Sequence, residues 1–451
     1  MTQAFRTTFS RGILTLAAVP LLGACAGGLF GGGDKSDEIT PTVGKRTPVL
    51  SRVESGAVVD PSLATVSVVL PPAQTNTEWA QSGGTASNAS GHLSLAANPA
   101  PAWTADISGS TNRRRLADAP VVGGGKLYVV DTDGTVHAFD AASGSRVWSH
   151  DMQIEGRLRD SAFGGGVSYG GARVYATNGV GEVLALDANT GAEIWKVKPA
   201  GPLRGAPTIA FNSIYVMTQD NQILALSASD GSQQWSESGS ATQAGVFGVA
   251  APAAGQGTVI AGYSSGELAA YRYENGRLLW SDALARTSIS TEVGSLTDID
   301  ADPIIQSGRV YALGQGGRMA TYELVTGQRV WELNLAGIST PAISGEWIFT
   351  LTDDARLLAI ARSTGKVRWI SQLARYRNEE KKKDPIFWTG PVLAGGNLYV
   401  ASSRGQVLRV DAGTGTASAF TELSDPVSLP PVVANNTLYV LDDGGRIHAF
   451  R

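Results

Sequence analysis

The chain has 451 residues, enough for about two or three average domains or for one large repeat fold. Only 17% of the residues are charged and 55 are glycine, a composition typical of short strands joined by tight turns. A formal net charge of -4 and an isoelectric point near 5.7 give no indication of nucleic-acid binding, and a single cysteine excludes an internal disulfide.

Residues 1–24 have the three parts of an export signal. Arg6 and Arg11 precede an apolar run at 13–22 that is too short to span a membrane as a helix, and small residues follow it. The run ends in Leu-Gly-Ala-Cys25, which resembles the bacterial lipoprotein box and places the one cysteine at the cleavage site. That resemblance implies a lipid-modified Cys25 as the mature N-terminus, and Ala26 after it points to the outer membrane. A free thiol behind an ordinary signal peptide is the alternative.

Residues 25–75 are predicted to be the lipidated cysteine and a flexible tether. The stretch contains three consecutive glycines at 31–33, mixed charges and several prolines, so it has little apolar surface to bury. Within it, 66–70 is apolar and β-branched enough to form one extra strand. A single folded domain is expected at 76–451, with Trp79 packed against it.

One short pattern recurs through most of this domain. Its clearest copy, 182–195, predicts a strand, a turn with Asp187 and Gly191, and a second strand that ends in Trp195. Asp bonds its own backbone where a chain reverses, and Gly adopts the left-handed conformation of a short hairpin without a Cβ penalty. We expect the tryptophans to dock between neighbouring sheets. The other copies are 136–148, 223–235, 268–280, 319–331, 357–369 and 407–420, the last with Phe420 in the tryptophan position.

Two further apolar stretches precede each hairpin, so each unit comprises four strands. Eight units can be traced, and the last, 430–451, ends before its fourth strand. The isolated stretch 102–107, with Trp103 at the matching place, can supply that strand. The sequence therefore predicts an all-β fold: an eight-bladed β-propeller of four-stranded antiparallel blades, closed by an N-terminal strand.

Two motifs suggest chemistry but lack the context that the chemistry needs. The stretch 262–266 matches G-x-S-x-G, yet a nucleophilic serine elbow leads into a helix, and here 267–271 is another strand; a hairpin turn is expected. The stretch 298–302 resembles the start of a calcium loop, but Pro303 and Arg309 stand where Gly and Glu are required. Neither motif predicts a catalytic or calcium site.

The histidines and one charged run also have structural explanations. His137 and His448 occupy the same position of the first and last units, and we expect them on sheet faces rather than on a metal. The mixed run at 375–388 is typical of a solvated loop, with a partner-binding loop as the alternative.

The Asp-x-x-Thr-Gly-x-x-x-Trp hairpins resemble the repeats of the eight-bladed quinoprotein dehydrogenases and of the BamB family, propeller lipoproteins of the bacterial outer-membrane protein assembly machine. A dehydrogenase implies pyrroloquinoline quinone over calcium, a catalytic Asp and commonly a disulfide between neighbouring cysteines. This chain has one cysteine and lacks the added length of those enzymes, and its lipoprotein start fits BamB. We therefore expect a non-enzymatic scaffold without a cofactor; a periplasmic quinone-dependent dehydrogenase is the alternative.

The BamB resemblance also suggests partner-binding residues. Ser290-Thr-Glu followed by Asp298-Ile-Asp300 is similar to the BamB loop that binds BamA through its periplasmic domains, so Asp298 and Asp300 are the first candidates; capping of the turn before Pro303 is the alternative. A companion Leu-x-Leu-Arg-Gly segment of the family aligns with 244–248, which makes Val246 and Phe247 further candidates, although the leucines and the arginine are changed.

The same resemblance implies the other partners and the location. It implies contact with the remaining components of the assembly complex and with unfolded outer-membrane protein clients. The open edges of the blades suggest strand addition as a way to bind such clients. It also places the chain on the periplasmic face of the outer membrane, held by the lipid on Cys25.

Overall fold

The structure is a computed structural model that describes residues 57–154, 156–240, 250–284 and 297–451. All of these residues fall within one compact unit. Cys25, Val246, Phe247 and the segment 290–295 lie outside the described residues, so the predictions made for them stay predictions.

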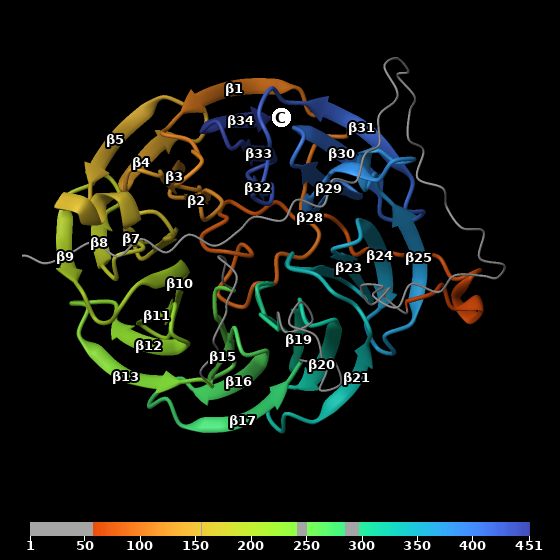
Figure 1. The fold of residues 1–451 in the computed structure, drawn as a ribbon, viewed down its shortest axis with the longest axis horizontal. Coiled ribbons are helices and arrows are strands. Elements are labelled where there is room, and N and C mark those ends of the chain that lie inside the picture. The colour runs from red at the N-terminus through yellow and green to blue at the C-terminus, as the bar shows by residue number, and fades with distance from the viewer. Residues whose placement is uncertain (1–56, 155, 241–249, 285–296) are drawn as a thin grey trace, which may run out of the picture. The chain divides into compact units, whose positions relative to one another are not determined.

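Eight four-stranded antiparallel sheets are arranged around a central axis, as Figure 1 shows, which confirms the predicted propeller. Blades one to four consist of β2 (Val121–Gly123), β3 (Lys126–Val130), β4 (Thr135–Asp140) and β5 (Arg146–Asp151); β6 (Val167–Gly170), β7 (Arg173–Thr177), β8 (Val183–Asp187) and β9 (Glu193–Val197); β10 (Leu203–Ala210), β11 (Ser213–Thr218), β12 (Gln222–Ser227) and β13 (Gln233–Ser238); and β14 (Ala253–Gly255), β15 (Thr258–Gly262), β16 (Glu267–Arg272) and β17 (Leu278–Ala283). Blades five to eight consist of β18 (Ile304–Gln306), β19 (Arg309–Gly314), β20 (Arg318–Glu323) and β21 (Arg329–Leu333); β22 (Ala342–Ser344), β23 (Trp347–Leu351), β24 (Arg356–Ala361) and β25 (Val367–Gln372); β28 (Trp388–Ala394), β29 (Asn397–Ser402), β30 (Gln406–Asp411) and β31 (Ala417–Glu422); and β32 (Val432–Ala434), β33 (Thr437–Leu441), β34 (Arg446–Phe450) and β1 (Pro101–Asp106).

The N-terminal strand closes the ring as predicted. β1 pairs with β34 in the last blade, with Trp103 opposite Ala449 and Ala105 opposite Ile447. The backbone N–H groups of Ala100 and Arg451 each donate to the carbonyl of the other, at 2.6 and 2.9 Å. The two ends of the folded domain are thus joined within one sheet, so the ring is closed by hydrogen bonds.

Each hairpin tryptophan, and Trp103 of the N-terminal strand, docks on the turn of the next blade, which confirms the predicted role of the hairpin tryptophans. The ring of Trp148 covers Gly191, where an added Cβ would lie 2.7 Å from the ring, and its Nε1–H donates to the carbonyl of Ala188 at 3.1 Å. The middle strands are buried on both faces because a blade packs against two neighbours, whereas Trp148 is the only buried residue of the outer strand β5. The equivalent pairs are Trp103–Gly144, Trp195–Gly231, Trp235–Gly276, Trp280–Gly327, Trp331–Gly365 and Trp369–Gly415.

The junction between blades seven and eight departs from this pattern. In blade six the pairing of β24 with β25 has its bulge between Ala359 and Ile360. In blade seven the corresponding bulge, in the pairing of β30 with β31, lies nearer the start of the strand, between Val407 and Leu408. Phe420 still lies between the two blades, with ring centroids 5.4 Å from Tyr399 and 5.1 Å from Phe450. It meets the paired chain ends of blade eight rather than a hairpin turn.

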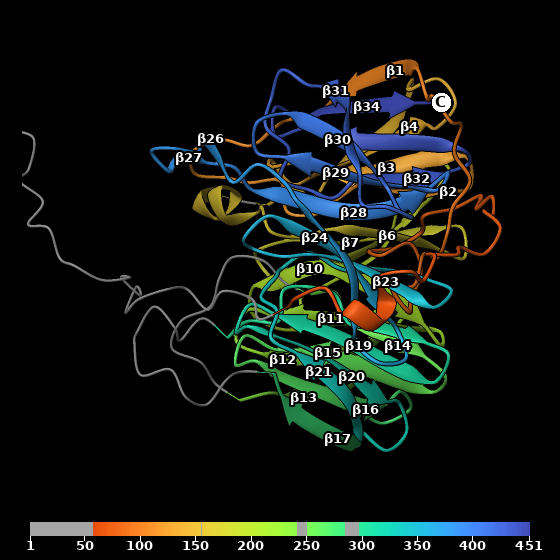
Figure 2. The same cartoon turned by 90° about the vertical axis from the view of Figure 1, so that its right-hand side faces the viewer.

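Residues 71–95, here called the cap segment, lie across one face of the ring (Figure 2). They contact the inner strand of every blade, or the turn directly after it, mostly through backbone hydrogen bonds. The contacts, in blade order from one to eight, are Trp79 with Val122, Ala80 with Tyr169, Gln81 with Ile209, Ala86 with Ala254, Ser87 with Ile305, Pro71 with Gly345, Leu93 with Leu393, and Asn76 with Asn435.

The chain upstream of the cap segment runs along the outside of blade six. Asp60 donates its N–H to the carbonyl of Val367 at 2.9 Å, and Asp60 also caps the short 3-10 helix η1 (Pro61–Leu63). The predicted strand at 66–70 is wrong, because this stretch has no partner strand; instead, the carbonyl of Val66 accepts a hydrogen bond from Arg368. The proposed flexible tether is therefore held against the ring from residue 57 onward.

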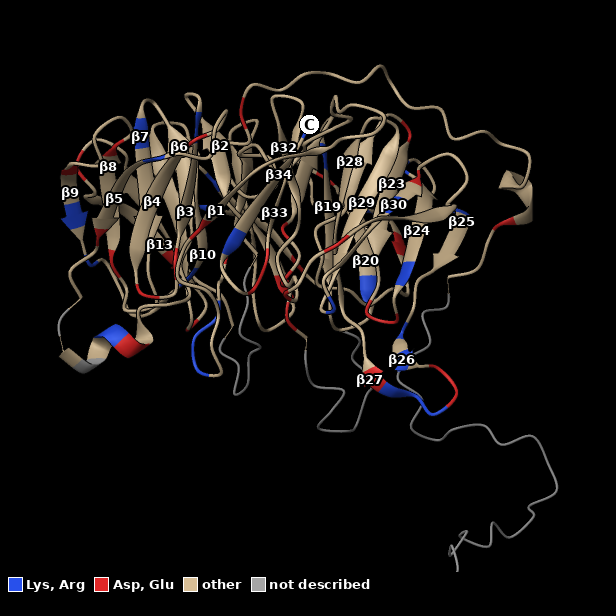
Figure 3. Ribbon diagram, turned by 90° about the horizontal axis from the view of Figure 1, so that it is seen from above, with Lys and Arg blue, Asp and Glu red and all other residues tan. Residues whose placement is uncertain are grey.

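The opposite face carries the longer connections between blades. The 3-10 helix η2 (Gly156–Ser161) and a hairpin of β26 (Tyr376–Asn378) and β27 (Lys383–Pro385) project from it (Figures 2 and 3). The hairpin is the charged run of the sequence, and most of its residues are exposed, as expected for a solvated segment. We call this side the loop face.

Candidate functional site

Asp298 and Asp300 lie on a short segment, 297–302, that leads into the inner strand β18 of blade five. The segment packs on blade four, where Ile299 donates its N–H to the carbonyl of Tyr263 at 3.3 Å and Thr297 donates its hydroxyl to the carbonyl of Ser264 at 3.1 Å. The carbonyl of Asp298 accepts the N–H of Gln315 at 2.9 Å. The backbone of the segment is therefore fixed by two blades.

The two carboxylates differ in exposure and in surroundings. Asp298 is fully buried, and its Oδ1 lies 4.0 Å from Nη2 of Arg204 on β10. Asp300 is half-buried; burial and the neighbouring charge of Asp298 raise its pKa to about 7, although Arg204 partly offsets them. Asp353 adds a third negative charge nearby. Of the two predicted binding aspartates, Asp300 is the one that reaches the surface.

Arg204 is the site residue that the sequence reasoning missed. It is buried, and Nη1 donates a hydrogen bond to Oγ of Ser264 in the turn between β15 and β16. That turn is the G-x-S-x-G stretch, and its predicted assignment as a hairpin turn is confirmed. The available signal was position: among the eight inner strands, all of them described, only β10 contains a charged residue.

Two further carboxylates are buried close to the axis. Asp302 accepts hydrogen bonds from Ser82 of the cap segment at 2.7 Å and from the N–H of Ala251 at 2.7 Å, and burial raises its pKa to about 6. Asp118, before β2, accepts the N–H of Ala119 at 2.9 Å, and burial, together with the charge of Asp302, raises its pKa to about 8. Between about pH 4 and pH 6, both groups therefore hold protons that the unfolded chain releases.

We expect the free energy of unfolding to fall as the pH rises from about 4 to about 8. Folded Asp118, Asp302 and Asp300 bind more protons than the unfolded chain in this window, so their protonation stabilises the fold at its acidic end. Replacing Asp118 with Asn should shrink the difference between pH 5 and pH 8 by on the order of 3 kcal/mol. Urea unfolding at the two pH values measures this.

Carboxylates with lowered pKa provide the control for that measurement. The hydrogen bonds that Asp187 accepts from Thr190 lower its pKa, so it titrates below the window. Replacing Asp187 with Asn should leave the pH 5 to pH 8 difference unchanged. An equal difference in the wild-type and Asp118→Asn proteins would contradict the prediction.

His137 and His448 bond to aspartates in the turns of their own blades. Nε2 of His137 lies 2.9 Å from Oδ2 of Asp131, and Nε2 of His448 lies 2.8 Å from Oδ2 of Asp442. Burial raises the pKa of Asp131, but the hydrogen bonds from His137 and from the turn amides outweigh it and lower the pKa overall. The other six blades have neither the Asp nor the His at these positions. Each hydrogen-bonded pair therefore stabilises only the turn of its own blade.

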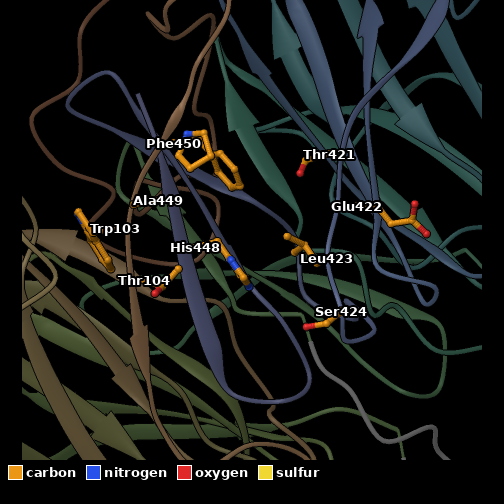
Figure 4. Close-up of a pocket in the computed structure, with 10 residues that line it drawn as sticks. Trp103, Thr104, Thr421, Glu422, Leu423, Ser424, His448, Ala449 and Phe450 are labelled. Carbon is orange, nitrogen blue, oxygen red and sulfur yellow. The ribbon is translucent and has the colours of Figure 1, made fainter.

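A cavity of about 240 Å³ lies at the junction of blades seven and eight (Figure 4). Trp103, His448 and Phe450 line one side, and Thr421 and Leu423 line the other. It forms where the regular tryptophan and turn contact is replaced by Phe420 and the two chain ends.

The described residues form no calcium site of the kind that accompanies the quinone in those dehydrogenases. Calcium takes six to eight oxygen ligands, yet in the described ranges no group of three or more His, Cys, Asp or Glu side chains is placed to hold a metal ion. The buried carboxylate of Asp298 faces the guanidinium of Arg204 instead.

No helix in the described part of the chain has the length and apolarity to cross a membrane.

A closed ring of eight four-stranded blades places this chain among the large β-propellers. A family profile described as outer membrane protein assembly factor BamB matches residues 95–159, 132–371 and 373–451. The chain belongs to this family.

Curated relatives and solved structures agree with that assignment. The BamB of Vibrio cholerae is 31% identical over 350 residues, covering 77% of this chain and 88% of that protein. The BamB of Yersinia pestis is 26% identical over 359 residues, covering 78% and 89%. The crystal structure of BamB from Moraxella catarrhalis superposes with a TM-score of 0.65 at 20% identity, covering 78% of this chain and 99% of that chain.

Dehydrogenases share the fold at lower identity. Quinohemoprotein alcohol dehydrogenase from Comamonas testosteroni superposes with a TM-score of 0.64 at 15% identity, covering 84% of this chain and 81% of that one. At this identity the likeness establishes the propeller fold alone.

Proposed function

We propose that this chain is a non-catalytic scaffold of outer-membrane protein assembly. It is held by the lipid on Cys25 at the periplasmic face of the outer membrane and binds the periplasmic domains of BamA. The observation that carries the proposal is membership of the BamB family across the whole ring, 95–451. The quinoprotein alternative receives no support from the described residues, which lack a metal-ligand set.

The arrangement of the two faces supports the loop face as the partner surface. The cap segment contacts all eight blades on the other face and occupies their inner-strand ends. Residues 297–298 lie against the turns of blades four and five at Ser264 and Gln315, and Asp300, two residues further on, is partly exposed. A rigid ring that presents loops at one face is suited to recognition without a large change of shape.

The outer edge of blade six supports a second element of the proposal, contact with extended clients. Val59 forms a parallel bridge with Val367 of β25, so the chain itself adds an extended segment to a blade edge. Main-chain hydrogen bonds of this kind do not depend on side-chain identity and would accept varied client segments at unoccupied edges.

The test is a pull-down from detergent-solubilised membranes with the wild-type protein and with Asp300→Ala. We expect BamA to co-purify with the wild type and to be reduced roughly tenfold with the variant, since a partly exposed carboxylate at the interface is removed. Asp133→Ala is the control, because Asp133 is a half-exposed aspartate in a turn of blade one.

Three outcomes separate the function from its site. Loss with Asp300→Ala but not with Asp133→Ala supports both. Equal recovery of BamA with both variants would leave the scaffold function standing and remove Asp300 from the interface. Absence of BamA from the wild-type sample would rule out the proposed function.

A further inference from the structure

The cavity between blades seven and eight lies where the repeated contact between blades is interrupted. At the other seven junctions the indole of a tryptophan covers the turn glycine of the next blade. In most of them the indole N–H also donates to a backbone carbonyl of that blade, as Trp369 does to Ala412 at 3.1 Å. Here Phe420 stands in place of tryptophan, and no hairpin turn follows β34 because the outer strand of blade eight is β1.

The cavity has the size and the lining of a site for one aromatic ring. A cavity of about 150 Å³ can hold benzene, so the volume of about 240 Å³ is enough for an indole. Trp103, Leu423 and Phe450 provide apolar walls from both sides (Figure 4). Thr104 and Ser424 also line the cavity and are exposed, so it is open to solvent. Mainly apolar walls with a few polar groups are typical of ligand sites.

His448 supplies a fixed polar group in this lining. Its Nε2 lies 2.8 Å from Oδ2 of Asp442, whose side chain is fully buried. Oδ1 of the same aspartate accepts the N–H of Arg446 at 2.9 Å, which holds the carboxylate in place. A carboxylate accepts hydrogen bonds, so Nε2 carries the proton and Nδ1 of the neutral ring is an acceptor. The cavity therefore favours an aromatic group with an N–H or O–H donor, such as an indole or a phenol.

Two open sheet edges flank the cavity. β31 is the outermost strand of blade seven and β1 that of blade eight, and most residues of β31 are exposed. An extended polypeptide can pair with such an edge through its main chain while one of its side chains enters a neighbouring pocket. At blade six the chain's own Val59 bridges Val367 of the corresponding outer strand, so an outer strand of this ring does accept extended chain. An extended polypeptide fits the edge and the cavity together.

We propose that this cavity binds the side chain of one tryptophan or tyrosine from an extended polypeptide that lies along β31. The incoming ring completes the junction as the tryptophans do at the other seven, and its N–H or O–H donates to Nδ1 of His448. This inference deepens the proposed function, because it names the side-chain class that an extended client presents, and it rests on that function for the identity of the partner.

The experiment measures binding of capped peptides to the full mature protein in detergent. The peptides alternate threonine and serine around one central residue, and the probe has fluorotryptophan there, so that fluorine NMR follows its binding and its displacement. We expect the alanine peptide to bind roughly thirtyfold more weakly than the tryptophan peptide, because no ring is buried. The phenylalanine peptide should bind roughly fivefold more weakly, because it lacks the donor. Free N-acetyltryptophanamide should bind roughly tenfold more weakly, because it cannot pair along β31.

Two variants fill the cavity from opposite sides. Thr104→Trp on β1 and Ser424→Trp after β31 each start from an exposed residue that lines the cavity, so the core of neither blade is altered. Each should weaken binding of the tryptophan peptide by roughly tenfold or more, since its own indole occupies the space. Unfolding temperatures recorded in parallel show that each variant is folded.

His448→Leu and His137→Leu form a matched pair. Each removes a histidine that bonds a turn aspartate at the same position of its blade, but of these two only His448 lines the cavity. We expect His448→Leu to bind the tryptophan peptide no more tightly than the wild type binds the phenylalanine peptide. His137→Leu should stay within about twofold of the wild type. Equal losses in the two variants would overturn the role of His448.

The remaining outcomes separate the inference from the proposed function. Equal affinity of the wild type for the tryptophan and alanine peptides would overturn the inference, as would undiminished binding by folded Thr104→Trp and Ser424→Trp proteins. N-acetyltryptophanamide that binds as tightly as the peptide would overturn the polypeptide as occupant. Recovery of BamA by a wild-type protein that binds no peptide leaves the scaffold function standing. Peptide binding without recovery of BamA removes that function and supports the cavity as a site for aromatic side chains.

Discussion

Replacing Ala105 with Asp is expected to lower the free energy of unfolding by about 4 kcal/mol and to open the ring at blade eight. Ala105 is the one fully buried residue of β1, where it lies opposite Ile447 and packs in the apolar cluster of the last blade. A carboxylate there has to be desolvated or protonated without a partner. Urea unfolding followed by tryptophan fluorescence measures the loss.

Thr104→Asp is the control for this substitution. Thr104 is the preceding residue on the same strand, and it is exposed. The added charge is the same, but it remains in water, so the expected change is within about 0.5 kcal/mol. If both variants lose the same stability, the loss comes from charge on the strand and not from the burial that closes the ring.

The ring of blades could be predicted because the same sequence pattern is repeated along the chain. Each hairpin contains a turn glycine and a tryptophan, and the structure shows that both are needed for one contact, as with Gly191 and Trp148. Seven copies of this contact make the signal strong in a single sequence. The sequence also showed that the last unit has only three strands of its own, and that the isolated stretch 102–107 could supply the fourth.

The cap segment could not be predicted because it carries no repeat. Its contacts with the blades are mainly backbone hydrogen bonds, such as those of Trp79 with Val122 and of Ala80 with Tyr169, and these leave no side-chain pattern. The apolar stretch 66–70 misled the prediction for a related reason. Its composition favours a strand, but a strand also needs a neighbour, and the chain there meets the side chain of Arg368 instead.

The candidate site was only partly accessible from the sequence. The resemblance located Asp298 and Asp300, but Arg204, which lies 4.0 Å from Asp298, comes from another blade and is almost a hundred residues away in the sequence. Contacts across blades do not follow the period of the repeat. Two signals nevertheless marked Arg204: it is a charged residue in an inner strand, and it stands in a Leu-Arg-Gly run at 203–205.

Replacing Gly191 with Ala is expected to lower the free energy of unfolding by about 3 kcal/mol, from two causes that a second glycine separates. Gly191 has φ +72°, and its added Cβ would lie 2.7 Å from the ring of Trp148, so the variant must both strain the turn and displace the indole. Gly125 has φ +76° and nothing within 4 Å of an added Cβ, so Gly125→Ala should cost only the backbone term, about 1 kcal/mol. Equal losses in the two variants, measured by urea unfolding, would show that the tryptophan contact contributes nothing. If the loss caused by Gly191→Ala falls to the backbone term of about 1 kcal/mol when it is measured in the Trp148→Ala background, the contact between blades carries the difference.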